Sequence, residues 1–217
     1  MQLKEEKTAL NSKKEMNKLG IEMAKSEIAN TVEHALEIAE DLGYPVVVRP
    51  AYTMGGAGGG LVYNVEELKT VVSRGLQASL VHQCLIEESI LGWEELEVEV
   101  VRDANNNMIT VCFIENIDPL GVHTGDSFCS APMLTISQEV QDRLKDQAFR
   151  IVESIGVIGG TNVQFAHDPE TDRIVVIEIN PKNISFISFS IKSNRIPNCF
   201  SFSNVSGWFD YGRYSLW

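Results

Sequence analysis

The sequence predicts an α+β fold built from antiparallel sheets with helices packed on them. Two apolar runs, residues 44–49 and 61–64, flank a glycine-rich segment and predict a first hairpin. Glu alternates with apolar residues over Glu95–Arg102, and strand patterns also flank a turn at residues 168–172. Between these strands, apolar residues recur with the helical period of 3.6. These hairpins and helices together indicate the α+β class.

Helices are predicted on both sides of the first hairpin. Residues 1–20 are rich in Lys and Glu and predict a charged helix that a glycine ends. A second helix is predicted from an N-cap at Thr31 to Leu42, with Gly43 as its stop. Residues 65–78 predict a third helix. The apolar face of the second helix comprises Val32, Ala35, Leu36, Ala39 and Leu42.

Strands dominate the middle of the chain. Cys84–Ile90 predicts a strand that carries a pair of acids, and Glu95–Arg102 predicts a half-exposed antiparallel strand. Three asparagines at residues 105–107 indicate a turn, from which residues 108–115 return as a strand. We expect residues 117–133 to form a loop.

A helix and a hairpin are predicted next. Ser137 is a suitable N-cap for a helix that ends near Ile155. Residues 160–167 and 173–180 then predict the two strands of a hairpin. The predicted core face of the helix comprises Val140, Leu144, Ala148, Ile151, Val152 and Ile155.

The last hairpin carries candidate metal ligands. Period two places Glu178 and Asn180 on one face of their strand, and Gln164 lies on the facing strand. One carboxylate and two amides form an oxygen-only donor set, which suits Mg²⁺ shared with substrate phosphates. The alternative is that Glu178 is an ordinary solvated strand residue. We favour the metal because a candidate phosphate loop occurs in the same chain.

That candidate is the segment Arg49-Pro-Ala-Tyr-Thr-Met-Gly-Gly-Ala-Gly-Gly-Gly60. Backbone without side chains can approach a bulky anion and present its N–H groups to phosphate oxygens. Arg49 adds a fixed positive charge in a fork that suits phosphate. A flexible surface loop is the alternative. We favour phosphate binding because the segment directly follows a buried strand, although it does not match the P-loop pattern.

Composition excludes several classes of partner. The formal net charge of -12 argues against nucleic acid and against an anionic membrane. The N-terminus is charged and has no apolar signal core, and no apolar run is long enough to span a membrane. The cysteines lack metal-binding spacing, so we expect reduced, mostly buried thiols in a cytoplasmic protein. They are Cys84, Cys112, Cys129 and Cys199.

Four motifs together resemble the large subunit of carbamoyl-phosphate synthetase, over roughly Asn17 to Pro181. The glycine-rich segment looks like that of the first of the subunit's two homologous ATP-grasp halves. The other motifs are Glu115-Asn116 with Gly121-Val-His-Thr-Gly-Asp-Ser127, Asn162-Val-Gln-Phe165 and Glu178-Ile-Asn-Pro181. The resemblance implies an ATP-grasp fold, in which two α+β subdomains with antiparallel sheets grip the nucleotide.

The resemblance also implies roles for individual residues. The phosphate-contacting groups fall on Arg49, Gly55, Gly56 and His123. The adenine and ribose end of ATP falls near Glu88, Ile90 and Glu95, with Gly121 and Val122 beside it. The ligands of Mg²⁺ or Mn²⁺ fall on Gln164, Glu178 and Asn180, of which the first two also contact the nucleotide. The residues implied in catalysis are Arg49, His123 and Asn180.

The implied activity is ATP- and Mg-dependent phosphorylation of bicarbonate to carboxyphosphate, as a ligase of the arginine and pyrimidine pathways. The intact family enzyme also has a glutaminase small subunit as partner and a second ATP-grasp half, which we expect to be missing here. One alternative is a non-catalytic ATP-binding fragment or the product of a broken gene. A biotin-carboxylase-like ATP-grasp ligase is another, disfavoured because its glycine loop usually includes a Lys.

The resemblance implies two subdomains, residues 17–87 with the glycine-rich loop and residues 88–181 with the metal site. It stops at Pro181, where the family continues with Arg and a Ser-rich segment. Residues 182–217 instead hold 9 of the chain's 17 aromatic residues and a single acid, Asp210. Removing one base after a Pro181 codon CCA allows the reading Arg-Thr-Ser-Arg-Ser-Ser-Ala, which continues family-like to the last residue. We therefore expect a frameshifted tail.

The tail and the N-terminal segment carry the departures from the family. Lys182 stands where the family has an Arg, and so lacks the bidentate fork. Residues 1–16 form a divergent segment in which Ala9 occupies the place of a family Arg. This segment is open to the same frameshift explanation. We also expect an exposed apolar patch, because the layer that normally follows Pro181 is replaced.

Overall fold

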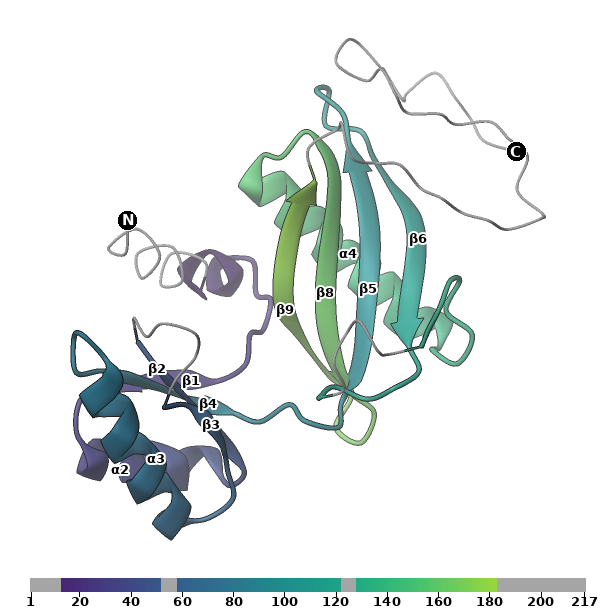
Figure 1. Cartoon of the computed structure of the whole chain (residues 1–217). Coiled ribbons are helices and arrows are strands. Elements are labelled where there is room, and N and C mark those ends of the chain that lie inside the picture. Colours follow the sequence, from purple (N-terminus) through teal and green to yellow (C-terminus); the bar gives the residue numbers. More distant parts are fainter. Residues whose placement is uncertain (1–12, 52–57, 122–127, 183–217) are drawn as a thin grey trace. The chain divides into compact units, whose positions relative to one another are not determined.

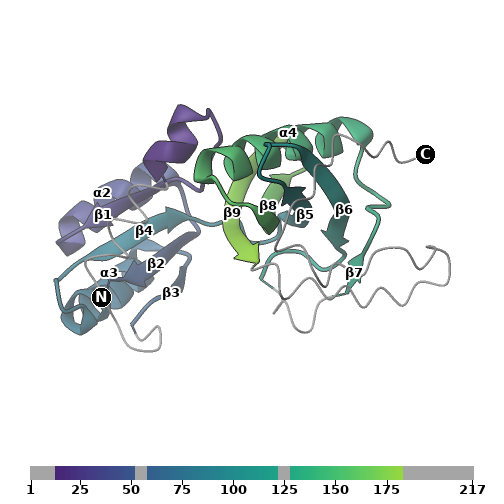
Figure 2. The same cartoon turned by 90° about the horizontal axis from the view of Figure 1, so that it is seen from above.

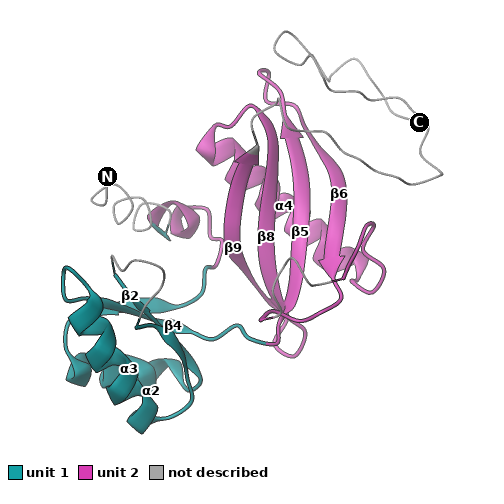
Figure 3. Ribbon diagram, viewed as in Figure 1, with its two compact units in different colours: residues 1–13, 23–91 teal, residues 14–22, 92–217 magenta. Residues whose placement is uncertain are grey.

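The computed structural model describes residues 13–51, 58–121 and 128–182. The chain divides into two compact units, coloured separately in Figure 3. Unit 1 comprises residues 1–13 and 23–91, and unit 2 comprises residues 14–22 and 92–217. Each unit has one antiparallel sheet with helix packed on it, which confirms the predicted α+β class. Of the helices described, none is both long enough and apolar enough to cross a membrane.

Unit 1 contains a sheet in the order β1-β4-β2-β3, with every neighbouring pair antiparallel (Figure 1). Strands β2 and β3 form the predicted hairpin around the glycine-rich segment, with Val46 opposite Val62. The second strand ends before Asn64 because that residue caps the next helix. The strand bounds are β1 (Ser26–Ala29), β2 (Val46–Pro50), β3 (Gly60–Val62) and β4 (Cys84–Glu88).

Two helices cover one face of this sheet, α2 (Val32–Leu42) and α3 (Val65–Ala78). The hydroxyl of Thr31 accepts from the His34 N–H, and Gly43 ends α2 at φ 80, as predicted. Asn64 accepts from the Glu67 N–H, while Glu67 accepts from the Tyr63 N–H. Both helices therefore start at capped ends. Their shared core with the sheet contains Ala35, Ile38, Ala39, Leu68, Val72, Val46, Val48, Val62 and Ile86.

Unit 2 contains a sheet in the order β7-β6-β5-β8-β9. Helix α4 (Gln138–Ile155) lies along one face of it, as Figure 2 shows from above. Ser137 caps α4 by accepting from the Val140 N–H, as predicted. The strand bounds are β5 (Glu94–Arg102), β6 (Met108–Asn116), β7 (Cys129–Ser130), β8 (Gly159–Asp168) and β9 (Arg173–Lys182).

Several predictions about unit 2 are wrong in detail. Strand β5 is not half-exposed, because it is the central strand and its Glu95 and Glu99 are buried. Ile155 is exposed rather than in the core, since it is the last residue of α4. The expected loop after Asn116 includes the short strand β7. A short strand of this kind has no hydrophobic period to reveal it.

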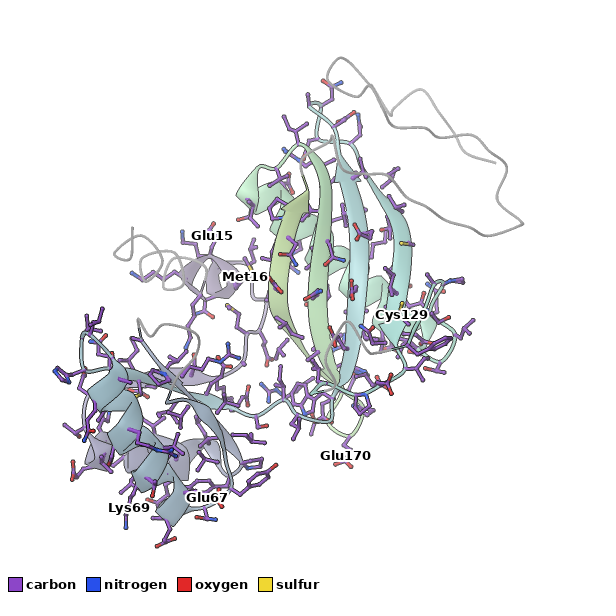
Figure 4. All side chains as sticks on the ribbon, in the orientation of Figure 1. Glu15, Met16, Glu67, Lys69, Cys129 and Glu170 are labelled. Carbon is purple, nitrogen blue, oxygen red and sulfur yellow. The ribbon has the colours of Figure 1, made fainter. Side chains whose placement is uncertain are left out.

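The predicted N-terminal helix is described only in part, and the prediction for the cysteines needs correction. The described part of the predicted first helix covers residues 13–18 and is followed by a turn at Gly20. Cys84, Cys112 and Cys129 are reduced, as expected, but of these three only Cys84 is fully buried. Cys129 is exposed on β7 (Figure 4). Residues 1–12 and Cys199 lie outside the described residues.

Candidate functional site

In unit 1, Arg49 lies on the sheet face that the helices leave open. Its neighbours Val46 and Val48 are buried in the core, and because side chains alternate along a strand, Arg49 points to the other face. The guanidinium is 3.0 Å from the Glu87 carboxylate on β4, yet the Arg49 side chain is 66% exposed. Arg49 is thus held by one carboxylate and keeps N–H donors available to an anion.

Glu87 is the partner that sequence reasoning noted only as one of two adjacent acids. Burial raises the pKa of Glu87, and the charge of Arg49 opposes that rise without cancelling it. The neighbouring acid, Glu88, raises the pKa further. An anion that bound Arg49 would compete with a carboxylate whose charged form is already disfavoured.

The predicted nucleotide residues Glu88 and Ile90 follow at the end of β4. The Glu88 carboxylate accepts from the Lys25 N–H at 2.8 Å, and the Glu88 N–H donates to the Lys25 carbonyl at 2.8 Å. Ile90 is half-buried in the connection beyond the strand. Glu88 therefore fixes the end of β4 to the segment that precedes β1.

Four predicted site residues, Gly55, Gly56, Val122 and His123, lie outside the described residues. Gly121 is described and exposed, with φ 113, a backbone conformation that other residues rarely adopt. The predicted contacts of these residues with nucleotide stay predictions.

In unit 2, strands β8 and β9 bring the predicted metal ligands to one face. Gln164 lies directly opposite Glu178, and Asn180 lies opposite Asn162 in the next pair on that face. Glu178 is exposed, while Gln164 and Asn180 are partly buried. A β-bulge between this pair and the preceding one, Phe165 with Val176, sets the register. Bulges of this kind are common next to active sites, where they redirect side chains.

The central strand β5 adds acids to the same face, which the sequence reasoning missed. Glu97 lies opposite Gln164, and Glu99 lies opposite Asn162. The Asn162 amide donates to Glu97 at 2.8 Å and to Glu99 at 3.1 Å. The Asn116 amide donates to the other oxygen of Glu97 at 3.3 Å. The alternation of Glu along β5 was the available signal, but it was interpreted as solvent exposure.

Glu95, a predicted nucleotide contact, lies on this face as well. It is buried, and burial raises its pKa, with the nearby charge of Glu97 adding to the rise. Because burial disfavours the charged form of Glu95, this carboxyl suits contact with a polar group of a ligand better than contact with a second cation.

The donor chemistry on β8 and β9 fits a hard divalent cation. In residues 13–51, 58–121 and 128–182, no group of three or more His, Cys, Asp or Glu side chains is placed to hold a metal. The candidate trio has one carboxylate, Glu178, and the amide oxygens of Gln164 and Asn180. Such an oxygen-only set with a single charge suits Mg²⁺ or Mn²⁺ when a ligand's phosphates complete the coordination.

Comparison with known proteins identifies one family. The model of the family described as "Carbamoyl-phosphate synthase L chain, ATP binding domain" matches residues 9–187. The chain is 52% identical over 171 residues to the carbamoyl phosphate synthase large chain of Thermotoga petrophila, covering 78% of this chain and 16% of that protein. The large chain of Xylella fastidiosa is 49% identical over 183 residues, covering 84% and 17%. The chain thus spans about a sixth of the length of these relatives.

Solved structures show the fold. A biotin carboxylase complex from Campylobacter jejuni matches with a TM-score of 0.64 and 21% identity, covering 79% of this chain and 39% of that one. N5-carboxyaminoimidazole synthetase from Staphylococcus aureus matches with a TM-score of 0.62 and 23% identity, covering 80% and 43%. At this level of identity the likeness concerns architecture, and the architecture is the ATP-grasp fold.

Proposed function

The chain belongs to the family of carbamoyl-phosphate synthase L chain ATP-binding domains, and from this premise we propose that it uses MgATP to phosphorylate bicarbonate. The observation that carries the proposal is the register of β8 and β9, which puts Gln164 opposite Glu178 and Asn180 in the next pair on the same face. Solvent exposure alone does not explain why one carboxylate and two amides share this strand face. A site for a metal bound to phosphates explains that donor set.

The proposed reaction is phosphoryl transfer without a protein nucleophile. A bicarbonate oxygen forms a bond to the γ-phosphorus of ATP while the bond to the β–γ bridging oxygen breaks, which releases ADP and leaves carboxyphosphate. Arg49 binds phosphate oxygens and offsets their negative charge. Positioning and charge neutralisation are the main contributions that a protein makes to such a transfer.

The metal-binding residues have a separate task. Gln164, Glu178 and Asn180 would hold Mg²⁺, which when bound neutralises charge on the ATP phosphates. Glu97 and Glu99 keep Asn162 fixed through its amide, and Asn162 faces Asn180 across the register. We propose that this network orients the ligand strand, in the way that outer-shell hydrogen bonds orient metal ligands.

A non-catalytic ATP-binding role is the second candidate, because Lys182 replaces the Arg that the resemblance implies after Asn180-Pro181. Lys keeps the charge but presents it as a point rather than as a planar fork. The source of ammonia, a glutaminase partner and a second ATP-grasp half belong to the larger enzyme that we propose as the context of this domain.

Calorimetric titration with MgATP tests the proposal, with Glu178→Ala as the variant. We expect binding by the unchanged chain and a loss of affinity of at least about tenfold, or 1.4 kcal/mol, in the variant. Glu170→Ala is the matched control, because Glu170 is an exposed acid in the turn between β8 and β9 (Figure 4). Equal binding by all three proteins would contradict the assignment of the metal site.

A second measurement separates catalysis from binding alone. Bicarbonate-dependent release of ADP is expected from the unchanged chain and is expected to fall in Arg49→Ala. Binding of MgATP with no bicarbonate-dependent turnover would favour the non-catalytic fragment. Turnover unaffected by Arg49→Ala would contradict the role of that residue.

A further inference from the structure

Gly75 is an unexpected residue at its position in helix α3. Glycine is less favourable than alanine inside a helix, so an interior glycine usually has a packing reason. The exposed side of α3 carries Glu67 and Lys69 (Figure 4), whereas Gly75 is buried. A Cβ atom at Gly75 would lie 2.8 Å from the Cys84 Sγ, 3.0 Å from the Pro50 Cγ and 3.4 Å from the Gly58 carbonyl oxygen.

Two of these three neighbours are the described ends of the glycine-rich segment. Pro50 is the last residue of β2, and Gly58 lies just before β3. Gly58 has φ 86, and a Cβ on it would be 3.4 Å from the Gly75 Cα. Both ends therefore rest on the same point of α3.

Gly59 allows the two ends of the segment to pack closely against each other. A Cβ at Gly59 would lie 2.6 Å from the Val48 carbonyl oxygen and 2.9 Å from the Pro50 Cδ. Backbone at that distance cannot give way without moving β2. The glycines at 58 and 59 thus let one end of the segment pack directly on the other.

The third neighbour, Cys84, fills the space beside Gly75. Cys84 is fully buried on β4, and burial raises its pKa to about 11. The thiol is therefore neutral at ordinary pH and packs as a small apolar group rather than acting as a nucleophile.

We propose that Gly75 is a positioning residue for phosphate binding, because it provides the seat on α3 that holds both ends of the glycine-rich segment. The inference rests on the proposed function, in which Arg49 binds the phosphates of ATP. A methyl group at position 75 displaces Pro50, Gly58 or Cys84. Displacement of Pro50 moves Arg49, which precedes it on β2, and so weakens the contact of Arg49 with the phosphates. The adenine and ribose contacts come from other residues and are unaffected.

The test compares the affinities for MgATP and AMP, measured as the ratio of the two dissociation constants. In Gly75→Ala we expect MgATP to bind about tenfold more weakly, or 1.4 kcal/mol. Binding of AMP, which lacks the β- and γ-phosphates, is expected to stay the same. A second readout needs no nucleotide: the Ala51 N–H donates to the Gln83 carbonyl at 2.9 Å, and its hydrogen-exchange protection is expected to fall.

Two further variants isolate the steric cause. Gly75→Ala with Cys84→Ala removes the nearest clashing atom, so its ratio is expected to return towards that of Cys84→Ala alone. Gln77→Ala is the matched control on α3, because Gln77 is exposed on the same helix two residues after Gly75. That control is expected to leave the ratio unchanged.

The outcomes are distinguishable. No MgATP binding by the unchanged chain contradicts the proposed function itself. If the unchanged chain binds, an unaltered ratio and unaltered Ala51 protection in Gly75→Ala contradict the seat, as does equal weakening of MgATP and AMP. If Gly75→Ala does not fold, the double variant decides, because the Pro50 Cγ still lies 3.0 Å from the added Cβ: a ratio that stays different from that of Cys84→Ala alone supports the seat. An unaltered ratio, or failure to fold, makes Gly75 a packing residue only.

Discussion

Glu115 shows how a single buried carboxylate organises the chain around it. It is 2% exposed on β6, and its two oxygens accept from the Leu134 and Thr135 N–H groups and from the Thr135 hydroxyl. Burial alone would raise the pKa of Glu115, but these hydrogen bonds outweigh it and leave the pKa below the usual range. The charged form of Glu115 thus ties the segment before α4 to the sheet.

We expect Glu115→Gln to destabilise the fold by about 2 kcal/mol at pH 7, as for loss of hydrogen bonds to a charged group. A carboxyl whose folded pKa is lowered stabilises above its unfolded pKa, and this contribution disappears as pH falls through the folded pKa. The difference between the two proteins should therefore be constant above about pH 6 and shrink below about pH 4. Urea unfolding at several pH values measures it.

The control for this series is Glu170→Gln, an exposed acid in a turn. It is expected to change the free energy of unfolding by no more than about 0.5 kcal/mol. If Glu115→Gln lowered the free energy of unfolding by the same amount at pH 3.5, the packing of the side chain rather than its charge would hold the segment before α4 on the sheet.

Residue identity predicted which side chains of the last hairpin share a face better than it predicted their surroundings. The common face of Gln164, Glu178 and Asn180 follows from period two, which is a local signal. Glu97 and Glu99 could not be assigned to the same face, because that needs the order of strands in the sheet. The seat at Gly75 was invisible for the same reason, since its neighbours come from β2, β4 and the end of the glycine-rich segment.

At the scale of elements, the bulge in β9 decides which side chains share a face. Counting back from Glu178 by twos would put Val176 on the ligand face. The structure instead pairs Val176 with Phe165 and Glu178 with Gln164, so Ile177 is the extra residue. Ile177 is 36% exposed, as expected of a bulged residue outside the core.

Deleting Ile177 should therefore leave the site in place. A regular strand would still put Glu178 opposite Gln164, so we expect MgATP affinity within about threefold of the unchanged chain, or less than 1 kcal/mol. Deleting Ile179 is the matched comparison, because Asn180 would then move to the position opposite Val163 on the other face. That variant should lose at least about tenfold in affinity. Loss in both would mean that the bulge itself shapes the site.

The ends of the helices were the features best predicted from the sequence. The caps at Thr31 and Ser137 and the stop at Gly43 lie where the sequence places them, because capping depends on neighbouring residues alone. Strand β5 was misjudged because its burial depends on β6 and β8, which are distant in sequence. Local signals were enough to predict the helix ends. The grouping of side chains on one face of the sheet depends on pairing between strands that are distant in sequence.

At the scale of the whole molecule, the match to the family ends well before the last residue. The family model covers residues 9–187, and the chain continues to Trp217. We propose that residues 182–217 arise from a one-base shift of reading frame. The composition supports this, since one acid and 9 of 17 aromatic residues in that stretch are unusual for a protein with a net charge of -12. Nucleotide sequencing tests it: if no one-base change restores Arg-Thr-Ser-Arg after Pro181, the proposal is wrong.

The frameshift proposal also predicts how the protein behaves in solution. The described part of the chain already exposes large apolar side chains, among them Phe128 and Leu134. The sequence after Pro181 holds nine further aromatic residues, and exposed apolar area promotes association. We therefore expect the present chain to associate as its concentration is raised, and a chain with the restored segment to stay monomeric at the same concentrations. Light scattering and thermal unfolding of the two chains measure this. A present chain that stays monodisperse at high concentration and unfolds cooperatively would contradict this prediction.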